Sequence, residues 1–513
     1  MSKITKLIIQ AGGKGSRMDH LTLNRPKSLV SIGGKPVLYS IIDAFGTDLE
    51  AIIISDYKSD VLTTYLDNFP PSSPFRLVKA NGSGTLGGIG EAIKATDGNG
   101  FAIVWSDLYF TSTIGIGKIR ENTIGLSNEV KCRWSFVDGN LIEEPNTFLN
   151  NLGVVGLFFF PFPEVLQGIP ENGEFVKFLS DTKINLEPLV MNDIKEIGTY
   201  EAYRKARDSQ FTTRFFNSIS IQNNVVVKKP KDPAYSILIE DEIQWYKHVS
   251  NYGFNSIPKI ISYQPLSMEF IDGPQPFSLC DYENTIKSEV LIKICDKIDE
   301  LHKMGSTNFE HEVVEEVYVK KTLDRITRVS NLIPHKNSES FRVNGHNVTN
   351  LIISEYQSYI AEIFEKLLTK GKQFSVIHGD PTFSNMILKG KEREPVFIDP
   401  RGYFGSLKIF GDPLYDYAKL YYSAYGNYDY FNQGRFQLRI NGTDIDVKIK
   451  SERFEDASKL IEERLDKEMP SIKALHALIW LSLAGYVIDD YDAILASYFN
   501  GLQIFQEVFD EYA

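Results

Sequence analysis

Two short segments of the chain carry glycine, cationic and acidic residues at spacings that suit phosphate chemistry. In the first, an apolar run leads into Gln10-Ala11-Gly12-Gly13-Lys14-Gly15-Ser16-Arg17, and Lys27 follows. Glycines let a backbone approach a phosphate and turn successive N–H groups toward it, while nearby cations neutralise a leaving pyrophosphate. The segment fits neither the Walker A pattern nor the dinucleotide fingerprint. We therefore predict a nucleoside triphosphate site with Arg17 and Lys27 as catalytic cations and nucleotide contacts from Ala11, Gly12, Gly13, Gly15 and Ser16.

The second segment contains His378-Gly379-Asp380 and, five residues after the aspartate, Asn385. A strand-like run further on ends at Asp399. At this spacing one loop can hold a carboxylate against an acceptor hydroxyl while an amide oxygen and a second carboxylate reach a metal ion. We predict Asp380 as the catalytic base, and Asn385 and Asp399 as ligands of the Mg²⁺ that bridges the phosphates of ATP.

The first half of the chain alternates strand-like and helix-like runs, which must position the first site. Strands are expected at 7–10, 51–55 and 101–105, and helices at 37–45 and 59–66. Such alternation favours right-handed βαβ units and a mostly parallel sheet covered on both faces. This half is therefore predicted to be an α/β domain.

From about residue 211 the pattern changes to two strand-like runs around Asn223-Asn224 and a helix over about 237–248. Further helical patterns follow over 291–304, 348–371 and 475–509. We predict a domain boundary within 207–213. The resulting domains are 1–208 and 209–513, and the second divides into a smaller lobe of about 214–275 and a helical lobe of about 276–513.

Five motifs in order give the first half its resemblance to the sugar-1-phosphate nucleotidyltransferases and the related phosphocholine cytidylyltransferases: the glycine-rich turn, Gly84-Thr85, Asp107, Gly153 and Glu196. The resemblance implies a Rossmann-like, GT-A-like fold. It assigns nucleotide contacts to Gly84 and Thr85, a substrate contact to Gly153, and Mg²⁺ binding to Asp107 and Glu196. Glu196 stands where the family has an aspartate, so its carboxylate reaches one methylene further.

The second half resembles the aminoglycoside phosphotransferase and choline kinase superfamily in its H-G-D-x-x-x-x-N and I-D motifs. The resemblance implies an α+β, bilobal, kinase-like domain. Nucleotide binding would fall to Lys228, to Glu242 as its partner and to Glu269 at the hinge. Lys229 and Glu240 are close competitors for the lysine–glutamate pair. No glycine-rich phosphate loop is recognisable, and the segment Gly411-Asp412-Pro413-Leu414-Tyr415-Asp416 is interpreted as structural.

Composition excludes several classes of partner. The net charge of −12 without a cluster of Lys and Arg argues against nucleic acid binding. No apolar run approaches the roughly 18 residues of a membrane span, and no secretory signal is recognised. Three cysteines without C-x-x-C spacing argue against disulfides and structural zinc. We expect a cytoplasmic enzyme of small-molecule substrates, with homo-oligomerisation left open.

Together the two halves predict a bifunctional enzyme. The kinase would phosphorylate a small hydroxyl-bearing metabolite with ATP, and the nucleotidyltransferase would couple the product to a second NTP, CTP or UTP, with release of pyrophosphate. Mg²⁺ serves both sites. A sugar acceptor, giving an NDP-sugar for capsule or lipopolysaccharide synthesis, is the leading interpretation. The alternatives are a choline- or ethanolamine-type kinase with a cytidylyltransferase, and a chain in which one half is a non-catalytic nucleotide-binding module.

Overall fold

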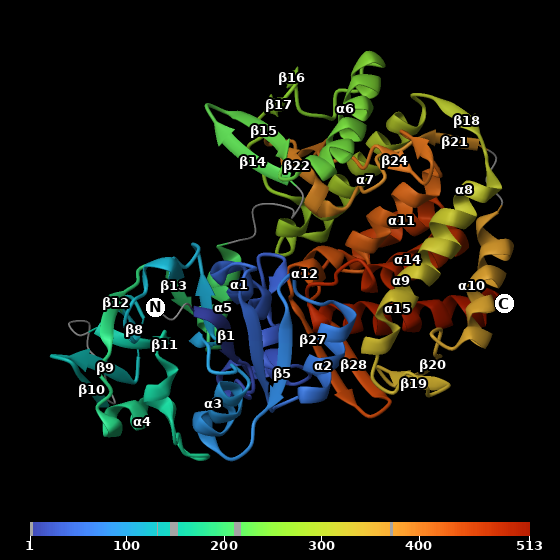
Figure 1. Cartoon of the computed structure of the whole chain (residues 1–513). Coiled ribbons are helices and arrows are strands. Elements are labelled where there is room, and N and C mark those ends of the chain that lie inside the picture. The colour runs from blue at the N-terminus through green and yellow to red at the C-terminus, as the bar shows by residue number, and fades with distance from the viewer. Residues whose placement is uncertain (1–3, 131, 144–151, 210–216, 370–372, 513) are drawn as a thin grey trace. The chain divides into compact units, whose positions relative to one another are not determined.

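The computed structural model of the chain describes residues 4–130, 132–143, 152–209, 217–369 and 373–512 (Figure 1). The chain divides into two compact units. Unit 1 comprises Met1–Thr212 and a short return segment, Ile488–Asp492, whereas unit 2 comprises Thr213–Val487 and Ala493–Ala513. The start of the smaller lobe predicted at about residue 214 lies outside the described residues.

Unit 1 is built on one mixed sheet. Its strands are β1 (Ile4–Gln10), β4 (Glu50–Ser55), β5 (Phe75–Lys79), β6 (Gly100–Trp105), β8 (Thr123–Ser127), β9 (Trp134–Val137), β10 (Asn140–Glu143), β11 (Leu152–Phe160) and β12 (Glu187–Val190). The main order is β10-β9-β11-β6-β1-β4-β5, and β8 pairs with β11 and β12. Parallel pairing links β6, β1, β4 and β5, whereas β11 runs antiparallel to β6. The predicted mostly parallel sheet is confirmed for this core.

The helices of unit 1 follow the apolar periodicity of the sequence. They are α1 (Val37–Phe45), α2 (Ser59–Asn68), α3 (Gly84–Lys94), α4 (Phe175–Thr182) and α5 (Tyr200–Asp208). Short strands β2 (Ser31–Ile32) and β3 (Lys35–Pro36) pair with each other, as do β7 (Leu108–Phe110) and β13 (Ile194–Glu196). The continuous apolar runs of β1, β4 and β6 are almost fully buried, as expected for parallel strands covered by helices.

Unit 2 begins with a four-stranded antiparallel sheet in the order β14-β15-β17-β16. Its strands are β14 (Asn217–Gln222), β15 (Val225–Pro230), β16 (Ile260–Tyr263) and β17 (Leu266–Glu269). Asn223 and Asn224 join β14 to β15 with φ of 51° and 60°, the left-handed pair that a two-residue hairpin requires. Helix α6 (Ser236–Asn251) contacts β15 and lies beside this sheet (Figure 1).

The remainder of unit 2 is mainly helical. Its helices are α7 (Asn284–His302), α8 (His311–Glu315), α9 (Lys321–Val329), α10 (Ser358–Ile363), α11 (Pro413–Ala424), α12 (Tyr428–Asn432), α13 (Glu455–Arg464), α14 (Met469–Ala484) and α15 (Tyr491–Tyr512). Helix α14 packs on α9 and α11, and nearly all its side chains are buried. None of the helices in the described part of the chain is long and apolar enough to cross a membrane.

Short strands occur among these helices. They are β18 (Ser306–Asn308), β19 (Ser340–Val343), β20 (His346–Thr349), β21 (Gln373–Val376), β22 (Met386–Lys389), β23 (Glu394–Phe397), β24 (Tyr403–Phe404), β25 (Leu407–Lys408), β26 (Phe410–Gly411), β27 (Phe436–Asn441) and β28 (Asp444–Ile449). The helix predicted over 348–371 is wrong at its start. Residues 346–349 pair as β20 with β19, and helix α10 begins only at Ser358. Residues 370 and 371 lie outside the described part.

Candidate functional site

The first candidate site lies at the carboxyl edge of the unit 1 sheet. Strand β1 has β4 on one side and β6 on the other, so the strand order reverses at β1. Gln10 at the end of β1 is in register with Trp105 at the end of β6. The glycine-rich turn and Asp107 therefore leave the sheet side by side. In open α/β sheets ligands bind at such a switch point.

The glycine-rich turn packs closely against its neighbours. A Cβ on Gly12 would lie 2.8 Å from Cβ of Asp56, and one on Gly13 would lie 3.4 Å from Cε of Lys27. Gly15 has a left-handed φ of 65°, which glycine adopts without strain. Ala11 is fully buried, and Ser16 begins a short 3₁₀ helix (Ser16–Thr22). The turn thus has the close packing and the backbone freedom that a phosphate-binding loop needs.

Four charged side chains predicted from the sequence meet beside this turn. Lys27 Nζ lies 2.8 Å from Asp107 Oδ2, and an Arg17 guanidinium nitrogen lies 3.8 Å from Glu196 Oε1. The β7–β13 ladder aligns Glu196 with Leu108, the residue after Asp107. The backbone N–H of Ile197 donates to the Asp107 carbonyl at 2.8 Å. This ladder is what brings the two acids together across 89 residues of sequence.

The space among these groups is bounded on one side by Gly198. A Cβ at this position would lie 2.3 Å from Glu196 Oε1, 3.2 Å from an Arg17 nitrogen and 3.3 Å from Asp107 Oδ2. Both carboxylates and a cation therefore face the same small volume. Substituting Gly198 would fill that volume directly.

The electrostatics of the two acids fit a hard divalent cation. Burial, and secondly the charge of Asp107, raise the pKa of Glu196, while Arg17 opposes them. Two neighbouring carboxylates that repel each other are what Mg²⁺ neutralises. Across the described residues there is no group of three His, Cys, Asp or Glu that could hold a metal. A metal at Asp107 and Glu196 would therefore need further oxygens from phosphates or water, which is usual for Mg²⁺.

Three other predicted residues of unit 1 have structural partners. Gly84 begins α3 with φ of 76°, and a Cβ there would lie 2.3 Å from the Gly173 carbonyl oxygen. The Thr85 hydroxyl accepts a hydrogen bond of 2.8 Å from the Phe175 N–H. Gly153 is buried in β11, where a Cβ would lie 2.8 Å from the sulfur of Cys132. Gly84 and Thr85 thus fasten the start of α3 to residues 173–175.

The second candidate site is assembled within unit 2 around a hairpin. Strand β22 follows Asn385, and β23 pairs with it so that Met386 faces Phe397. The Ile398 N–H donates to the Asn385 carbonyl at 3.0 Å. The register therefore places Asn385 beside the residue that precedes Asp399. Asp399 has φ of 56°, an uncommon conformation for a non-glycine residue that is often found at functional sites.

Asp380 and Asn385 are joined directly. The Asn385 side-chain amide donates to the Asp380 carbonyl oxygen at 2.8 Å and to its carboxylate at 2.9 Å. Asp380 is partly exposed, with 26% of its side chain accessible. Its carboxylate is therefore held in position while solvent, or a substrate, can still reach it.

Lys228 lies between two acids. Its ammonium group is 2.5 Å from Glu242 on α6 and 2.7 Å from Asp399. Burial by itself lowers the pKa of Lys228, but the charges of Asp399 and Glu242 outweigh it and raise that pKa. Of the competitors, Lys229 and Glu240 are exposed. The geometry therefore assigns the ion pair to Lys228 and Glu242.

The loop before Asp380 is fixed by Asp416 on α11. Its carboxylate accepts hydrogen bonds from the N–H groups of His378 at 2.8 Å and Gly379 at 2.7 Å. His302 also lies 3.1 Å from this carboxylate. The His378 ring is buried against the Ile398 carbonyl at 3.1 Å, and burial lowers its pKa. The structural interpretation of the segment around Asp416 agrees with these contacts.

Sequence reasoning missed Lys419 and Arg401. Lys419 Nζ lies 3.0 Å from Asp380 Oδ1. Arg401 packs against Gly379, whose added Cβ would lie 2.9 Å from the Arg401 Cβ. The position of Lys419 could have been predicted from the sequence. It lies three residues after Asp416, and residues three apart share one face of a helix. Arg401 immediately follows the predicted Asp399-Pro400 pair.

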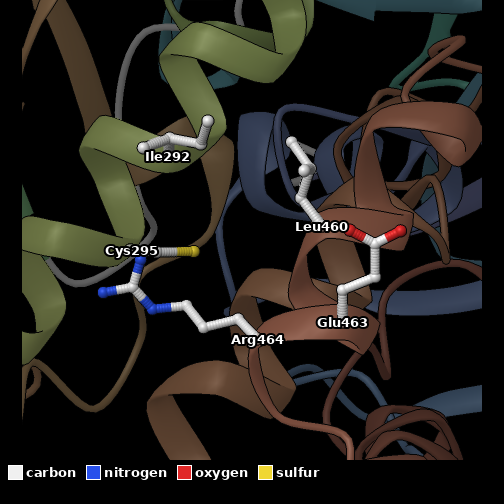
Figure 2. A pocket seen from close by; sticks show the side chains of 5 residues that line it. All are labelled: Ile292, Cys295, Leu460, Glu463 and Arg464. Atoms are coloured by element: carbon white, nitrogen blue, oxygen red, sulfur yellow. The ribbon is translucent and has the colours of Figure 1, made fainter.

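The remaining predicted residue, Glu269, ends β17. Its carboxylate accepts from the Lys259 N–H at 3.1 Å and lies 3.4 Å from the Lys389 ammonium. A separate pocket of about 310 Å³ lies between α7 and α13, lined by Ile292, Cys295, Leu460, Glu463 and Arg464 (Figure 2). No predicted site residue lines this pocket.

Comparison with known proteins finds similarity in the part of the chain that carries most of the first site. A family model described as a MobA-like NTP transferase domain matches residues 7–124. The chain is 33% identical over 107 residues to the bifunctional protein GlmU of Methanocaldococcus jannaschii, covering 20% of this chain and 25% of that protein. It is 38% identical over 66 residues to glucose-1-phosphate cytidylyltransferase of Salmonella typhimurium, covering 12% and 26%. The chain thus spans about a quarter of the length of these relatives.

Two solved structures are also similar. A UDP-glucose pyrophosphorylase complexed with UDP-glucose aligns with a TM-score of 0.35 and 17% identity, over 41% of this chain and 100% of that one. The CTP:phosphocholine cytidylyltransferase of Streptococcus pneumoniae aligns with a TM-score of 0.33 and 20% identity, over 40% and 99%. The matched family model covers the end of β1, the glycine-rich turn, Lys27 and Asp107. Residues 7–124 of the chain are thus similar to the MobA-like NTP transferase domain.

Proposed function

We propose that the chain is a bifunctional enzyme that phosphorylates a small hydroxyl-bearing metabolite with ATP and then couples the product to a second NTP. The observation that carries the proposal is a lysine–carboxylate pair in each unit. Arg17 and Glu196 accompany the pair in unit 1, and Asp380 and Asn385 belong to the same site as the pair in unit 2. In unit 1 the pair is Lys27 and Asp107, and in unit 2 it is Lys228 and Asp399.

In the proposed kinase step, Asp380 accepts the proton of the acceptor hydroxyl as that oxygen attacks the γ-phosphorus of ATP. The bond between the γ-phosphorus and the bridging oxygen breaks, and ADP leaves. Lys228, held by Glu242, binds the phosphates. Asn385 and Asp399 would hold Mg²⁺, which neutralises charge on the phosphates when bound.

In the proposed nucleotidyl transfer, an oxygen of the acceptor's phosphate attacks the α-phosphorus of the second NTP, and pyrophosphate leaves. The glycine-rich turn donates backbone N–H groups to the phosphates, while Arg17 and Lys27 stabilise negative charge on the departing pyrophosphate. Asp107 and Glu196 would hold Mg²⁺ at this site. No covalent intermediate on the protein is required.

The order of the two reactions follows from their chemistry. The phosphate added by the kinase is the nucleophile that a nucleotidyltransferase requires, so one chain would carry two consecutive steps. We propose a sugar acceptor and CTP or UTP as the second nucleotide, with the resulting NDP-sugar used in capsule or lipopolysaccharide synthesis in the cytoplasm. The name of one curated relative, glucose-1-phosphate cytidylyltransferase, supports a sugar phosphate as the nucleophile.

The test is a screen of the full chain with pooled sugars, sugar derivatives and amino alcohols, together with ATP, CTP, UTP and GTP. Mass spectrometry should detect a phosphorylated acceptor and its nucleotide-activated form. Asp380→Asn should stop both products from free acceptor but leave nucleotide activation of pre-phosphorylated acceptor intact. If neither product forms from any acceptor, the bifunctional proposal is wrong.

A further inference from the structure

Unit 2 gathers four cationic side chains around the rings of Tyr415 and Tyr486, from elements far apart in the sequence. We call Lys321 and Arg325 of α9, Arg401 of the loop after β23, and Lys419 of α11 the basic cluster. Lys419 Nζ lies 3.0 Å from Asp380 Oδ1. Lys321 and Arg401 meet Lys419 around the buried ring of Tyr415, and Arg325 lies over the ring of Tyr486.

Tyrosine rings hold the cluster together. The ammonium groups of Lys321 and Lys419 lie 5.8 Å and 5.9 Å from the centroid of the Tyr415 ring. An Arg401 nitrogen donates to the Tyr415 hydroxyl at 3.3 Å. Lys419 also lies 5.3 Å from the Tyr422 ring. These rings attract cations but carry no full negative charge while their hydroxyls are protonated.

The positive charge of the cluster is poorly compensated. Among ion pairs between described residues, the only one that involves the cluster is that of Lys419 with Asp380. Burial lowers the pKa of Lys321, and the positive charges of Arg401, Arg325 and Lys419 lower it further. Tyr415 opposes them, and the resulting pKa is about 7. Although burial alone raises the pKa of Tyr415, Lys419, Lys321 and Arg401 bring it down to about 7.

Partly buried cations are retained in a fold when something anionic compensates them. Even when Asp380 and Tyr415 are both ionised they are two anions among four cations, and the proposed task of Asp380 is to accept a proton from the acceptor. The missing negative charge must then come from a ligand. Because Lys419 touches the catalytic base itself, that ligand lies where the acceptor lies.

We propose that the acceptor phosphorylated in unit 2 is itself an anion, a hydroxylated metabolite that carries a carboxylate or a phosphate monoester close to the hydroxyl that is phosphorylated. This inference rests on the proposed kinase function and names its class of substrate. Hydroxy acids, sugar acids and sugar phosphates belong to this class. Neutral sugars and cationic amino alcohols do not.

The same contacts disfavour a choline-like acceptor. A quaternary ammonium group is recognised by the open faces of aromatic rings. Here protein cations already lie over the rings of Tyr415 and Tyr422. A second cation near Asp380 would also meet the repulsion of the cluster.

The phosphates of ATP are a less suitable partner for the whole cluster. Lys228, the lysine proposed to bind them, pairs with Glu242 and Asp399. The cluster instead surrounds Tyr415 and extends along α9 to Arg325, which lies 5.2 Å from the Tyr486 ring. Its contact with Asp380 is made by Lys419, at 3.0 Å.

The experiment compares matched acceptors on the full chain by ADP release. The pairs are glycerate against glycerol and glucose 6-phosphate against glucose, with choline as the cation. The anionic member should be the better substrate in at least one pair. A preference for glycerate would indicate carboxylate recognition, and a preference for glucose 6-phosphate would indicate phosphate recognition. Lys321→Gln and Arg325→Gln should each raise the acceptor KM roughly tenfold or more, because a hydrogen-bonded charge contact is lost. The KM for ATP should change little.

Lys320→Gln serves as the matched control, since Lys320 is the exposed neighbour of Lys321. Lys321→Arg keeps the charge and should restore much of the acceptor affinity. If neutral or cationic acceptors are preferred, or if Lys321→Gln raises the KM for ATP instead, the inference is wrong.

A binding measurement separates this inference from the kinase proposal. Inorganic phosphate is titrated calorimetrically into wild-type chain and into the Lys321→Gln, Arg325→Gln double variant, with circular dichroism to check folding. One class of phosphate sites should disappear in the double variant, even if no acceptor is turned over. Loss of that class without any turnover would overturn the kinase proposal alone, whereas unchanged phosphate binding would overturn the anionic acceptor.

Discussion

Gly198→Ala is the sharpest perturbation of the first site, because it adds one methyl group to the volume between the two carboxylates. Gly198 is not among the residues with positive φ, so alanine can adopt its backbone conformation. The added Cβ would lie 2.3 Å from Glu196 Oε1, against about 3.4 Å for ordinary contact. The Glu196 carboxylate must therefore retreat by about 1 Å, and its hydrogen bond from the Gly198 N–H at 3.1 Å is strained.

A displacement of about 1 Å in a catalytic group can reduce the rate by roughly 10²-fold. The same methyl group lies within 3.4 Å of Arg17 and Asp107, so the loss should reach at least that size. Pyrophosphate release would be measured on the full chain with pre-phosphorylated acceptor and the preferred NTP. ADP release from the kinase step should remain at the wild-type rate, because its residues belong to unit 2.

The matched control is Gly117→Ala, since nothing lies within 4 Å of a Cβ at that exposed glycine. It should leave both reactions unchanged. A Gly198→Ala protein that is folded and keeps full pyrophosphate release would refute the placement of the reacting phosphates between Glu196 and Asp107.

Three further predictions test separate features. Asp107→Asn should reduce pyrophosphate release by orders of magnitude and spare ADP release, a pattern that kinetics of the two half-reactions would reveal. Asp380→Asn should lower the kcat of ADP release by roughly 10²–10⁴-fold with ATP affinity retained, and an unchanged kcat would contradict its role as base. Hydrogen bonds from Arg76 and Lys6 lower the pKa of Glu50 to about 2. The ionised Glu50 therefore stabilises the fold fully at pH values above the ordinary pKa of a glutamate, and this stabilisation is lost as the pH falls toward 2. Glu50→Gln should therefore cost roughly 1 kcal/mol at pH 7 in urea unfolding, with a smaller cost near pH 3.

Much of the fold of unit 1 was predictable because its helices and strands have clear and different periods. Helix α1 occupies 37–45 as expected, and the apolar runs after it form buried strands. The start of the helix predicted from residue 348 was wrong because a short apolar run fits a strand as well as a helix. Pairing of β20 with β19 decided between them, and such pairing depends on residues outside the run.

The candidate sites show a similar division. Motif spacing placed Asp380, Asn385 and Asp399 on one loop and hairpin, where local register determines their contacts. The choice between Lys228 and Lys229 depended on which face of β15 is buried, which a sequence of adjacent lysines leaves open. Lys321 could not be predicted at all, because it reaches Tyr415 from a helix 94 residues away in the chain.

The two candidate sites share one electrostatic arrangement, a lysine paired with an aspartate. In the proposed reactions each site uses a lysine for the phosphates and a carboxylate for Mg²⁺, and neither charge is stable when buried alone. Lys27 with Asp107 and Lys228 with Asp399 neutralise each other at 2.8 Å and 2.7 Å before any nucleotide binds. A metal-bound nucleotide would bring a cation for the carboxylate and an anion for the lysine, so both charges would exchange partners and neither would be left unpaired. The basic cluster lacks such an internal partner for most of its charge, and for that reason its ligand must supply the negative charge.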